Sequence, residues 1–157
     1  MRIDYFQLID RIVDIDIAAR TIRAEAQVPE TSSIFEGHFP GYPILPGVLL
    51  IESMAQTAGW LVIAVTQFQR MPFLAAVKEA KLRRFVAPGQ LLSLEATLKH
   101  EGSGFAIVDA KGSADGKVVC DAQITFRVVD FPQPELRVHM ETMAKKLAFP
   151  FGAAADG

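Results

Sequence analysis

Residues 47–69 read GVLLIESMAQTAGWLVIAVTQFQ. This stretch contains no proline and few β-branched residues in its first turns, which predicts a single long helix. Apolar residues lie on nearly every side of that helix, and such a helix is either buried in a protein or spans a membrane. Its uncharged part, residues 53–69, is short for a bilayer and contains glutamine and threonine. We therefore expect a buried helix that the rest of the chain wraps.

Segments with the pattern of β-strands flank this helix. We expect strands over residues 11–17, 21–28, 92–101, 105–111 and 118–129. Apolar and polar residues alternate in the long segments after the helix, which is typical of half-buried strands. The pair Asp115-Gly116 predicts a hairpin turn before the last strand. Two strands, a long helix and then a meander of strands indicate an α+β domain with a mainly antiparallel sheet.

Length and composition exclude several classes of protein. The 157 residues fit one domain, and half of them are hydrophobic. A net charge of −2 gives no electrostatic reason to expect a nucleic-acid partner. The single cysteine, Cys120, cannot form an internal disulfide, and residues 1–10 lack the apolar core of a signal peptide. We expect a cytoplasmic protein that does not span a membrane.

One polar notch interrupts the apolar helix. Glu52 and Gln56 are four residues apart and so lie on one face, with Ser53 and Thr57 beside them. Burying a carboxylate is costly unless it is paired or protonated. Either a structural ion pair or a function in acid–base chemistry would account for Glu52.

The segment before the helix contains a candidate partner for Glu52. Residues 37–47 read GHFPGYPILPG, with a proline at every third position from residue 40 to residue 46. This spacing predicts a stiff, extended path, along which His38 could lie as far as about 25 Å from the start of the helix. A rigid loop that fixes an imidazole beside a carboxylate suits acid–base catalysis. We interpret His100 and His139 as ordinary polar residues.

The start of the helix adds a third chemical group. The backbone N–H groups of Gly47 and Val48 have no partner within the helix, and the positive end of the helix dipole lies behind them. Such donors can stabilise a developing oxyanion. A base, an acid and an oxyanion site together suit proton abstraction next to a carbonyl.

These residues form a composite pattern: Gly37-His38-Phe39-Pro40-Gly41-x-Pro43-x-x-Pro46-Gly47-Val48, then Glu52-x-Met54-Ala55-Gln56. The pattern resembles the signature of the 3-hydroxyacyl-[acyl-carrier-protein] dehydratases of the FabZ type. The resemblance runs from about residue 6 to about residue 127. It implies a hotdog fold, in which a curved antiparallel sheet wraps a long helix. It also implies dehydration of (3R)-3-hydroxyacyl thioesters, carried by acyl carrier protein, to trans-2-enoyl thioesters in fatty-acid or related lipid or polyketide biosynthesis.

The resemblance also assigns the site residues. His38 matches the catalytic histidine of the family, Glu52 its catalytic acid, and Gly47 the residue whose N–H polarises the thioester carbonyl. We place Val48 and Gln56 beside them in the oxyanion and substrate-binding set. The related isomerising dehydratases carry aspartate in place of Glu52, so the glutamate favours the plain dehydratase. The family uses no metal or organic cofactor, and it forms homodimers with shared active sites, often as trimers of dimers.

Two features depart from the family pattern. Family members have a longer amino terminus ahead of the segment that begins at Phe6. This chain also continues beyond Val129, and apolar residues recur at helical spacing over residues 134–148. Within a single domain of residues 1–157 we expect an extension at 131–149. It either covers surface left open at the amino terminus or is a peripheral helix, and residues 150–157 are expected to be a flexible tail.

Three other functions fit parts of the pattern. A hotdog acyl thioesterase would share the fold and an acid on the helix, but it would not need His38. A hydratase acting on coenzyme A esters would run the same chemistry in reverse. A non-catalytic acyl-binding subunit would gain nothing from Glu52. The chain has no Gly-x-Ser-x-Gly motif, which argues against a serine hydrolase.

Overall fold

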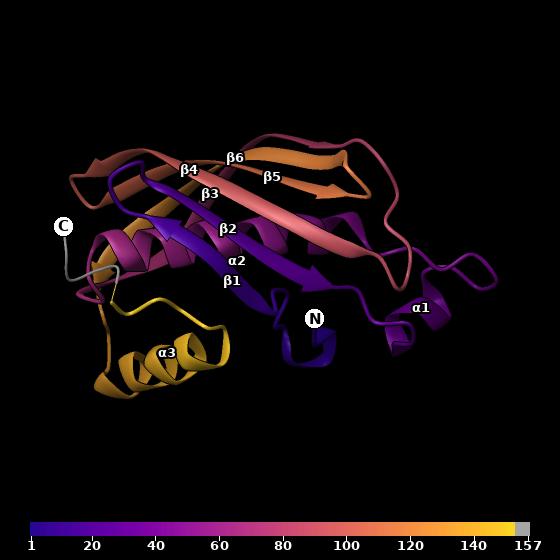
Figure 1. Ribbon diagram of the computed structural model, residues 1–157, viewed down its shortest axis with the longest axis horizontal. Helices are drawn as coiled ribbons and strands as arrows, with labels where there is room; N and C mark the ends of the chain where they lie inside the picture. The colour runs from indigo at the N-terminus through magenta and orange to yellow at the C-terminus, as the bar shows by residue number, and fades with distance from the viewer. Residues whose placement is uncertain (153–157) are drawn as a thin grey trace.

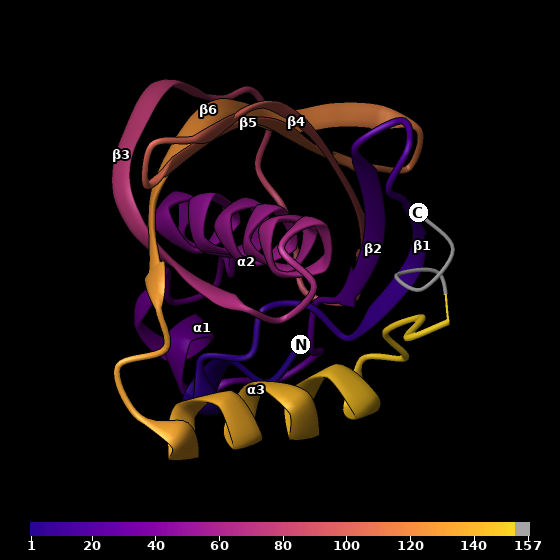
Figure 2. The same cartoon turned by 90° about the vertical axis from the view of Figure 1, so that its left-hand side faces the viewer.

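A six-stranded antiparallel sheet curves around one long helix (Figures 1 and 2). The computed structural model describes residues 1–152. A short 3₁₀ helix at Ile3–Tyr5 precedes the sheet. The strands are β1 (Arg11–Asp16), β2 (Thr21–Gln27), β3 (Arg70–Leu82), β4 (Leu91–Gly102), β5 (Phe105–Ala114) and β6 (Lys117–Asp130). The helices are α1 (Ser33–Gly37), α2 (Gly47–Val65) and α3 (Pro134–Lys146).

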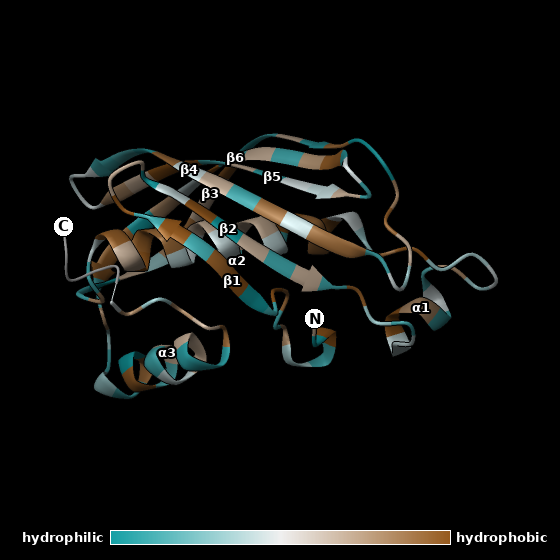
Figure 3. Cartoon of the chain, in the orientation of Figure 1, coloured by the Kyte–Doolittle hydropathy of each residue, from teal (hydrophilic) through white to brown (hydrophobic). Residues whose placement is uncertain are grey.

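The order of the strands explains why α2 lies inside the sheet. The order is β1-β2-β4-β5-β6-β3, so β2 and β3, which α2 connects, lie far apart in the sheet. The chain crosses the concave face between them, and α2 covers that face (Figure 2). Alternate residues of β4 and β6 are buried against α2, as the alternating pattern predicts. Figure 3 shows hydrophobic residues along α2 and alternating colours along β4. The predicted α+β class is confirmed.

The hairpin between β5 and β6 forms where the sequence predicts it. Asp115 and Gly116 both have positive φ angles, of 51° and 74°. A two-residue turn of this kind matches the twist of the two strands, and glycine adopts it without steric cost. The register then pairs Ala114 with Lys117 and Phe105 with Arg127.

Helix α2 is buried but ends four residues earlier than predicted. Gln67 and Phe68 adopt left-handed backbone conformations, with φ angles of 53° and 58°, and this stops the helix after Val65. The N–H of Phe68 donates instead to the carbonyl of Ile63. By length and composition alone α2 could cross a membrane, but 72% of its apolar window is buried inside the protein, as in the core helix of a globular fold.

Strand β3 has no equivalent among the predicted strands, for a physical reason. It is an edge strand, paired only with β6, and most of its residues are exposed, so it lacks the alternation of a half-buried strand. It also contains Pro72, which an edge strand tolerates because one side of its backbone needs no ladder hydrogen bond. Two irregularities of register further break its pattern, at Leu74/Ala76 and at Lys78/Lys81.

The carboxy-terminal segment folds back onto the domain (Figure 1). The predicted helix over 134–148 ends at Lys146, because Ala148 has a left-handed φ of 58°. The carbonyl of Leu147 then accepts a hydrogen bond of 2.7 Å from the N–H of Ile12. Phe149 packs edge-on against Phe68 with ring centroids 5.1 Å apart. Part of the predicted tail is therefore packed: the ring of residue 151 stacks on Phe68 at 5.8 Å, while residues 153–157 lie outside the described residues.

This packing predicts a large effect of one substitution. Phe149 is 5% exposed and contacts the rings of Trp60 and Phe68. Phe149→Ala should lower the free energy of unfolding by about 3–5 kcal/mol, because it leaves a cavity in an aromatic cluster. Phe151→Ala should cost less, because that side chain is 46% exposed. Chemical denaturation measures both, and equal stability of the Phe149 variant and the parent would show that this segment does not stabilise the domain.

Candidate active site

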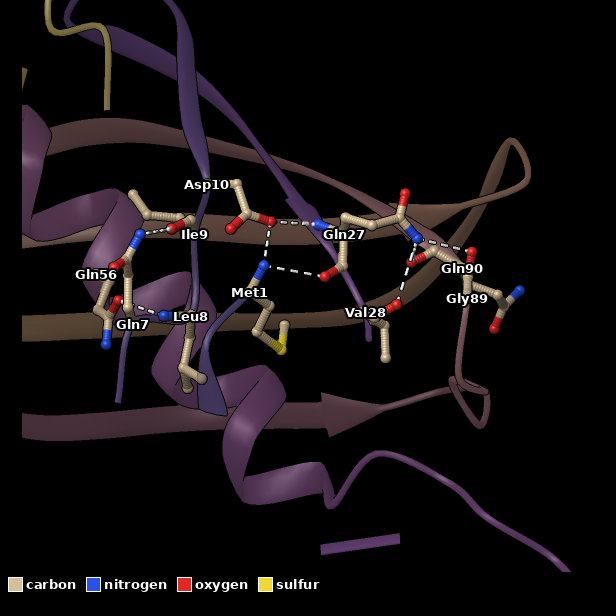
Figure 4. A network of polar contacts seen from close by, with 10 residues as sticks. All are labelled: Met1, Gln7, Leu8, Ile9, Asp10, Gln27, Val28, Gln56, Gly89 and Gln90. Atoms are coloured by element: carbon tan, nitrogen blue, oxygen red, sulfur yellow. Dashed lines mark hydrogen bonds and ion pairs between the residues drawn. The ribbon is translucent and has the colours of Figure 1, made fainter. Parts of the chain in front are cut away.

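Glu52 lies on the second turn of α2, where a glutamine fixes its position. The Gln56 side-chain Nε2 donates to Glu52 Oε1 at 3.1 Å and to the backbone carbonyl of Phe6 at 2.8 Å. Gln56 Oε1 accepts from the N–H of Leu8 at 3.0 Å (Figure 4). Because a backbone N–H can only donate, this contact determines which end of the amide faces Glu52. The amino-terminal segment thus orients the carboxylate through Gln56.

The network in Figure 4 continues along the amino-terminal segment. The amino group of Met1 forms an ion pair with Asp10, and Asp10 Oδ2 also accepts from the N–H of Gln27 at 2.7 Å. The amide of Gln27 donates in turn to the carbonyl of Gly89 at 2.8 Å. These contacts tie the segment that holds Gln56 to the ends of β2 and the loop before β4.

Within the predicted polar notch, Ser53 and Thr57 differ from Glu52 in burial and in hydrogen bonding. Ser53 and Thr57 are fully buried, and each hydroxyl donates to a carbonyl four residues earlier in α2, at 2.9 Å. Both hydroxyl groups are therefore hydrogen-bonded within α2, and Ser53 and Thr57 are not part of the candidate site. Glu52 itself is half-buried, not fully buried as expected, and within residues 1–152 it forms no ion pair. A structural ion pair therefore does not account for it.

His38 follows α1 directly and is held by its own loop. Its N–H donates to the carbonyl of Ile34 at 2.9 Å, and its ring Nδ1 lies 3.0 Å from the carbonyl oxygen of Ile44. A carbonyl oxygen only accepts, so Nδ1 carries the proton in this contact. The lone pair of the neutral ring is then on Nε2, where it can act as a base. The ring of Phe39 stacks on the imidazole at 4.2 Å.

The predicted extended path from His38 to α2 is wrong. The N–H of Ile44 donates to the carbonyl of His38 at 3.0 Å, and Phe39 and Tyr42 exchange two backbone hydrogen bonds. The loop therefore doubles back instead of running straight. Gly41 permits this turn, since its φ of 73° is unfavourable for other residues. The prolines stiffen a compact loop. The predicted distance of up to about 25 Å between His38 and the start of α2 therefore does not apply.

The start of α2 offers free backbone donors, as the sequence predicts. In the described part of the chain neither the Gly47 nor the Val48 N–H donates a hydrogen bond, and Val48 is 69% exposed. Both N–H groups therefore lack a protein partner in the described residues, at the positive end of the helix dipole. A Cβ on Gly47 would overlap Leu82 Cδ1, so β3 approaches the backbone closely at this point.

The predicted site residues fall into two groups within one chain. Glu52 and Gln56 are in contact and line a cavity, which His38 does not line. Between His38 and Glu52 no hydrogen bond or ion pair forms anywhere in residues 1–152. Figure 1 shows α1 and the loop that follows it beyond the strands at one end of the molecule. A single chain thus presents a basic group and an acidic group at separate places.

A cavity lies next to Glu52. Its volume is about 580 Å³, within the range of small-molecule sites. It lies between α2, the amino-terminal segment, β3 and α3. Its lining includes Glu52, Gly59, Trp60, Met71, Met140 and Met143. The sequence offers a signal for this lining, the helical spacing of the two methionines in α3, but the same spacing is equally typical of a helix that packs without a cavity.

The described residues support neither a metal site nor a reactive cysteine thiol. Across residues 1–152 no group of three or more histidine, cysteine or acidic side chains could hold a metal ion. Cys120 is fully buried on β6, and burial raises the pKa of its thiol to about 11. Such a thiol is protonated near neutral pH and is a poor nucleophile.

The buried thiol leads to a prediction on pH and labelling. Since the folded pKa of Cys120 is raised to about 11 from an ordinary value of about 8.5, its stabilising contribution is complete below the unfolded pKa. That contribution is lost as the pH rises through the folded pKa. The native protein should react far more slowly with a thiol reagent at pH 8 than the urea-unfolded protein does. Equal labelling rates in the two states would contradict the burial of Cys120.

Comparison with known proteins places the chain in a family. Residues 2–123 match the FabA-like domain family. The 3-hydroxyacyl-[acyl-carrier-protein] dehydratase FabZ of Levilactobacillus brevis is 39% identical over 120 residues, which cover 76% of this chain and 80% of that protein. The protein of the same name from Fusobacterium nucleatum is 37% identical over 126 residues, which cover 80% and 88%. The chain belongs to the FabA-like family.

Solved structures agree on the fold. A hypothetical thioesterase from Streptococcus pneumoniae with coenzyme A superposes with a TM-score of 0.63 at 15% identity, over 78% of this chain and 88% of that one. A putative thioesterase from Ralstonia eutropha gives 0.61 at 20% identity, over 73% and 81%. At such low identity these likenesses concern the fold alone. Together with the curved sheet around α2 they confirm the predicted hotdog fold.

Proposed function

We propose that this protein removes water from (3R)-3-hydroxyacyl thioesters carried by acyl carrier protein and produces trans-2-enoyl thioesters in fatty-acid or related lipid biosynthesis. The family and the names of the curated relatives support this reaction. The observation that carries the proposal is the pair of oriented groups. His38 has its Nδ1 bound to a carbonyl and its Nε2 free, while Gln56 holds Glu52 at a cavity. A cytoplasmic location is part of the proposal, supported by the single buried cysteine.

The elimination assigns one step to each group. His38 Nε2 takes the proton from the carbon next to the thioester, and the N–H groups of Gly47 and Val48 stabilise negative charge on the thioester oxygen. The electron pair of the broken C–H bond forms the C=C bond. The C–O bond to the hydroxyl breaks as Glu52 donates its proton, and the hydroxyl leaves as water. A proton transferred from His38 to Glu52 restores the starting state.

A complete site requires groups that one chain holds apart, which supports a shared site between two copies. We propose a homodimer in which His38 of one chain serves the Glu52 site of the other. Strand β3 is an edge strand of 13 residues that pairs only with β6 in the described chain, and Phe73 and Leu82 on it are 42% and 50% exposed. The open side of an edge strand carries backbone N–H and C=O groups that can pair with another chain. A two-fold axis beside β3 would continue the sheet into the second copy. We also propose that three such dimers assemble into one particle. The mass of that particle can be measured by sedimentation.

A direct assay separates this function from its alternatives. The formation of enoyl thioester is followed by absorbance with 3-hydroxyacyl substrates on carrier protein and on coenzyme A. Enoyl product from the carrier-protein substrate supports the proposal. Release of free thiol without enoyl product would identify a thioesterase, and turnover of coenzyme A esters alone would identify a hydratase. Binding without any turnover would identify a non-catalytic subunit and contradict the proposal.

A further inference from the structure

Helix α3 is attached to the rest of the protein at one end only. Ala144, Leu147 and Phe149 are at most 5% exposed, and the carbonyl of Leu147 accepts a hydrogen bond from the N–H of Ile12. Every residue of α3 before Ala144 is exposed or only partly buried. Because burial of apolar surface is what holds packed elements together, the attachment of α3 is concentrated at its carboxy-terminal end.

The polar groups of α3 provide no second attachment. Arg137 donates to Glu141 at 3.1 Å and the Thr142 hydroxyl donates to the carbonyl of Val138, so both contacts stay within the helix. Across residues 1–152 no hydrogen bond or ion pair joins residues 134–146 to another helix or strand. A segment with so few contacts opens at a lower cost in free energy than unfolding of the whole domain.

The connection from β6 to α3 leaves room for such an opening. Residues 131–133 follow the pair Arg70–Asp130, with which the sheet ends, and in the described chain their backbone forms no hydrogen bond to another helix or strand. Pro132 and Gln133 are exposed. A few residues at the end of an element are enough to form a hinge.

The unattached part of α3 lies next to the cavity that Glu52 lines. Figure 2 shows α3 across the side of the molecule that the curved sheet leaves open. His139, Met140 and Met143 line the cavity from α3, while Arg2 lines it from the amino-terminal segment. Since α3 lies outside the residues that match the family, this cover belongs to the extension of this chain.

We propose that α3 is a lid, anchored through residues 144–149, whose amino-terminal part moves away from the domain to admit a ligand to Glu52. The role of this lid rests on the proposed function, in which the ligand is a 3-hydroxyacyl thioester. Closure of the lid excludes water while the hydroxyl group leaves, and the enoyl product departs when the lid opens again.

Distances between spin labels test the movement without any reaction. Cys120 is buried and the pKa of its thiol is raised to about 11, so cysteines added at exposed positions take the label selectively. One label is placed on β2 by Arg23→Cys. The second is placed in the unattached part of α3 by Val138→Cys or beside the anchor by Lys145→Cys, and all three positions are exposed. An excess of unlabelled chain leaves most dimers with one labelled copy.

The two label pairs should give different results in pulsed electron paramagnetic resonance. We expect a broad or two-peaked distribution of distances for the pair at 23 and 138, because α3 moves there. The matched pair at 23 and 145 should give one narrow peak, because that end is anchored. Narrow single peaks for both pairs would overturn the lid.

A reversible cross-link tests whether the substrate enters beneath α3. Arg2→Cys and His139→Cys place thiols on the two sides of the cavity, and a bismaleimide with a disulfide in its linker joins them. The linked protein should lose most of its dehydration activity, and reduction of the linker should restore it. The control joins Glu135→Cys to Thr142→Cys, two exposed positions within α3, and should keep its activity.

The outcomes separate the lid from the reaction. Full activity of the protein linked between residues 2 and 139 would overturn the lid as the entrance for substrate. If even the unlinked parent dehydrates no 3-hydroxyacyl thioester, the proposed function fails, and the spin labels still decide whether α3 moves.

Discussion

His38→Ala is expected to lower the rate of dehydration by roughly a hundred- to ten-thousand-fold, the usual contribution of a general acid or base. The reason is the free Nε2 of the neutral ring, which the contact of Nδ1 with the Ile44 carbonyl leaves as the only basic nitrogen. Glu52→Gln should cause a loss of similar size, since an amide keeps the shape of the carboxyl group but cannot donate an acidic proton. Steady-state kinetics of enoyl formation measures both.

Two controls make this result specific. His139→Ala removes an exposed imidazole from the cavity rim and should retain most of the activity. Far-ultraviolet circular dichroism and melting temperature should show that the His38 and Glu52 variants fold, because both side chains are only half-buried. Near-normal turnover by either of these folded variants would contradict the assigned mechanism.

The two inactive variants are expected to restore activity when they are mixed. In a dimer with shared sites, one His38→Ala chain and one Glu52→Gln chain produce one site with both groups intact and one site with both groups changed. If subunits exchange freely, about half of the dimers are mixed, and about a quarter of the full activity returns. The physical reason is the separation of the two groups in one chain: His38 does not line the cavity that Glu52 lines.

Exchange must be verified for this result to be informative. Differently tagged subunits, isolated by two affinity steps, give pure mixed dimers, in which about half of the parent activity is expected. If both groups of each site came from one chain, every site in the mixture would lack one of them. No recovery in purified mixed dimers would then contradict the shared site, but not the assignment of His38 and Glu52.

The sequence alone predicted the fold class, which the structure confirms, and it named the residues of the candidate site. The apolar character of α2 on nearly every side required a wrapping sheet, and the alternation in β4 and β6 showed which faces pack against it. Spacing also brought Glu52 and Gln56 together, since residues four apart in a helix share a face. These properties depend on local periodicity, which a sequence carries directly.

Tertiary structure decided what depends on contacts between distant residues. The edge position of β3 removed its periodic signal, and the loop after His38 folds back through hydrogen bonds that its prolines do not predict. The cavity is also non-local, because its walls come from α2, β3, α3 and the amino-terminal segment. Met140 and Met143 have the same spacing whether their helix packs tightly or covers a space. Only the position of α3 over Gly59 distinguishes these cases, since an empty volume is a property of the assembled elements and not of any one segment.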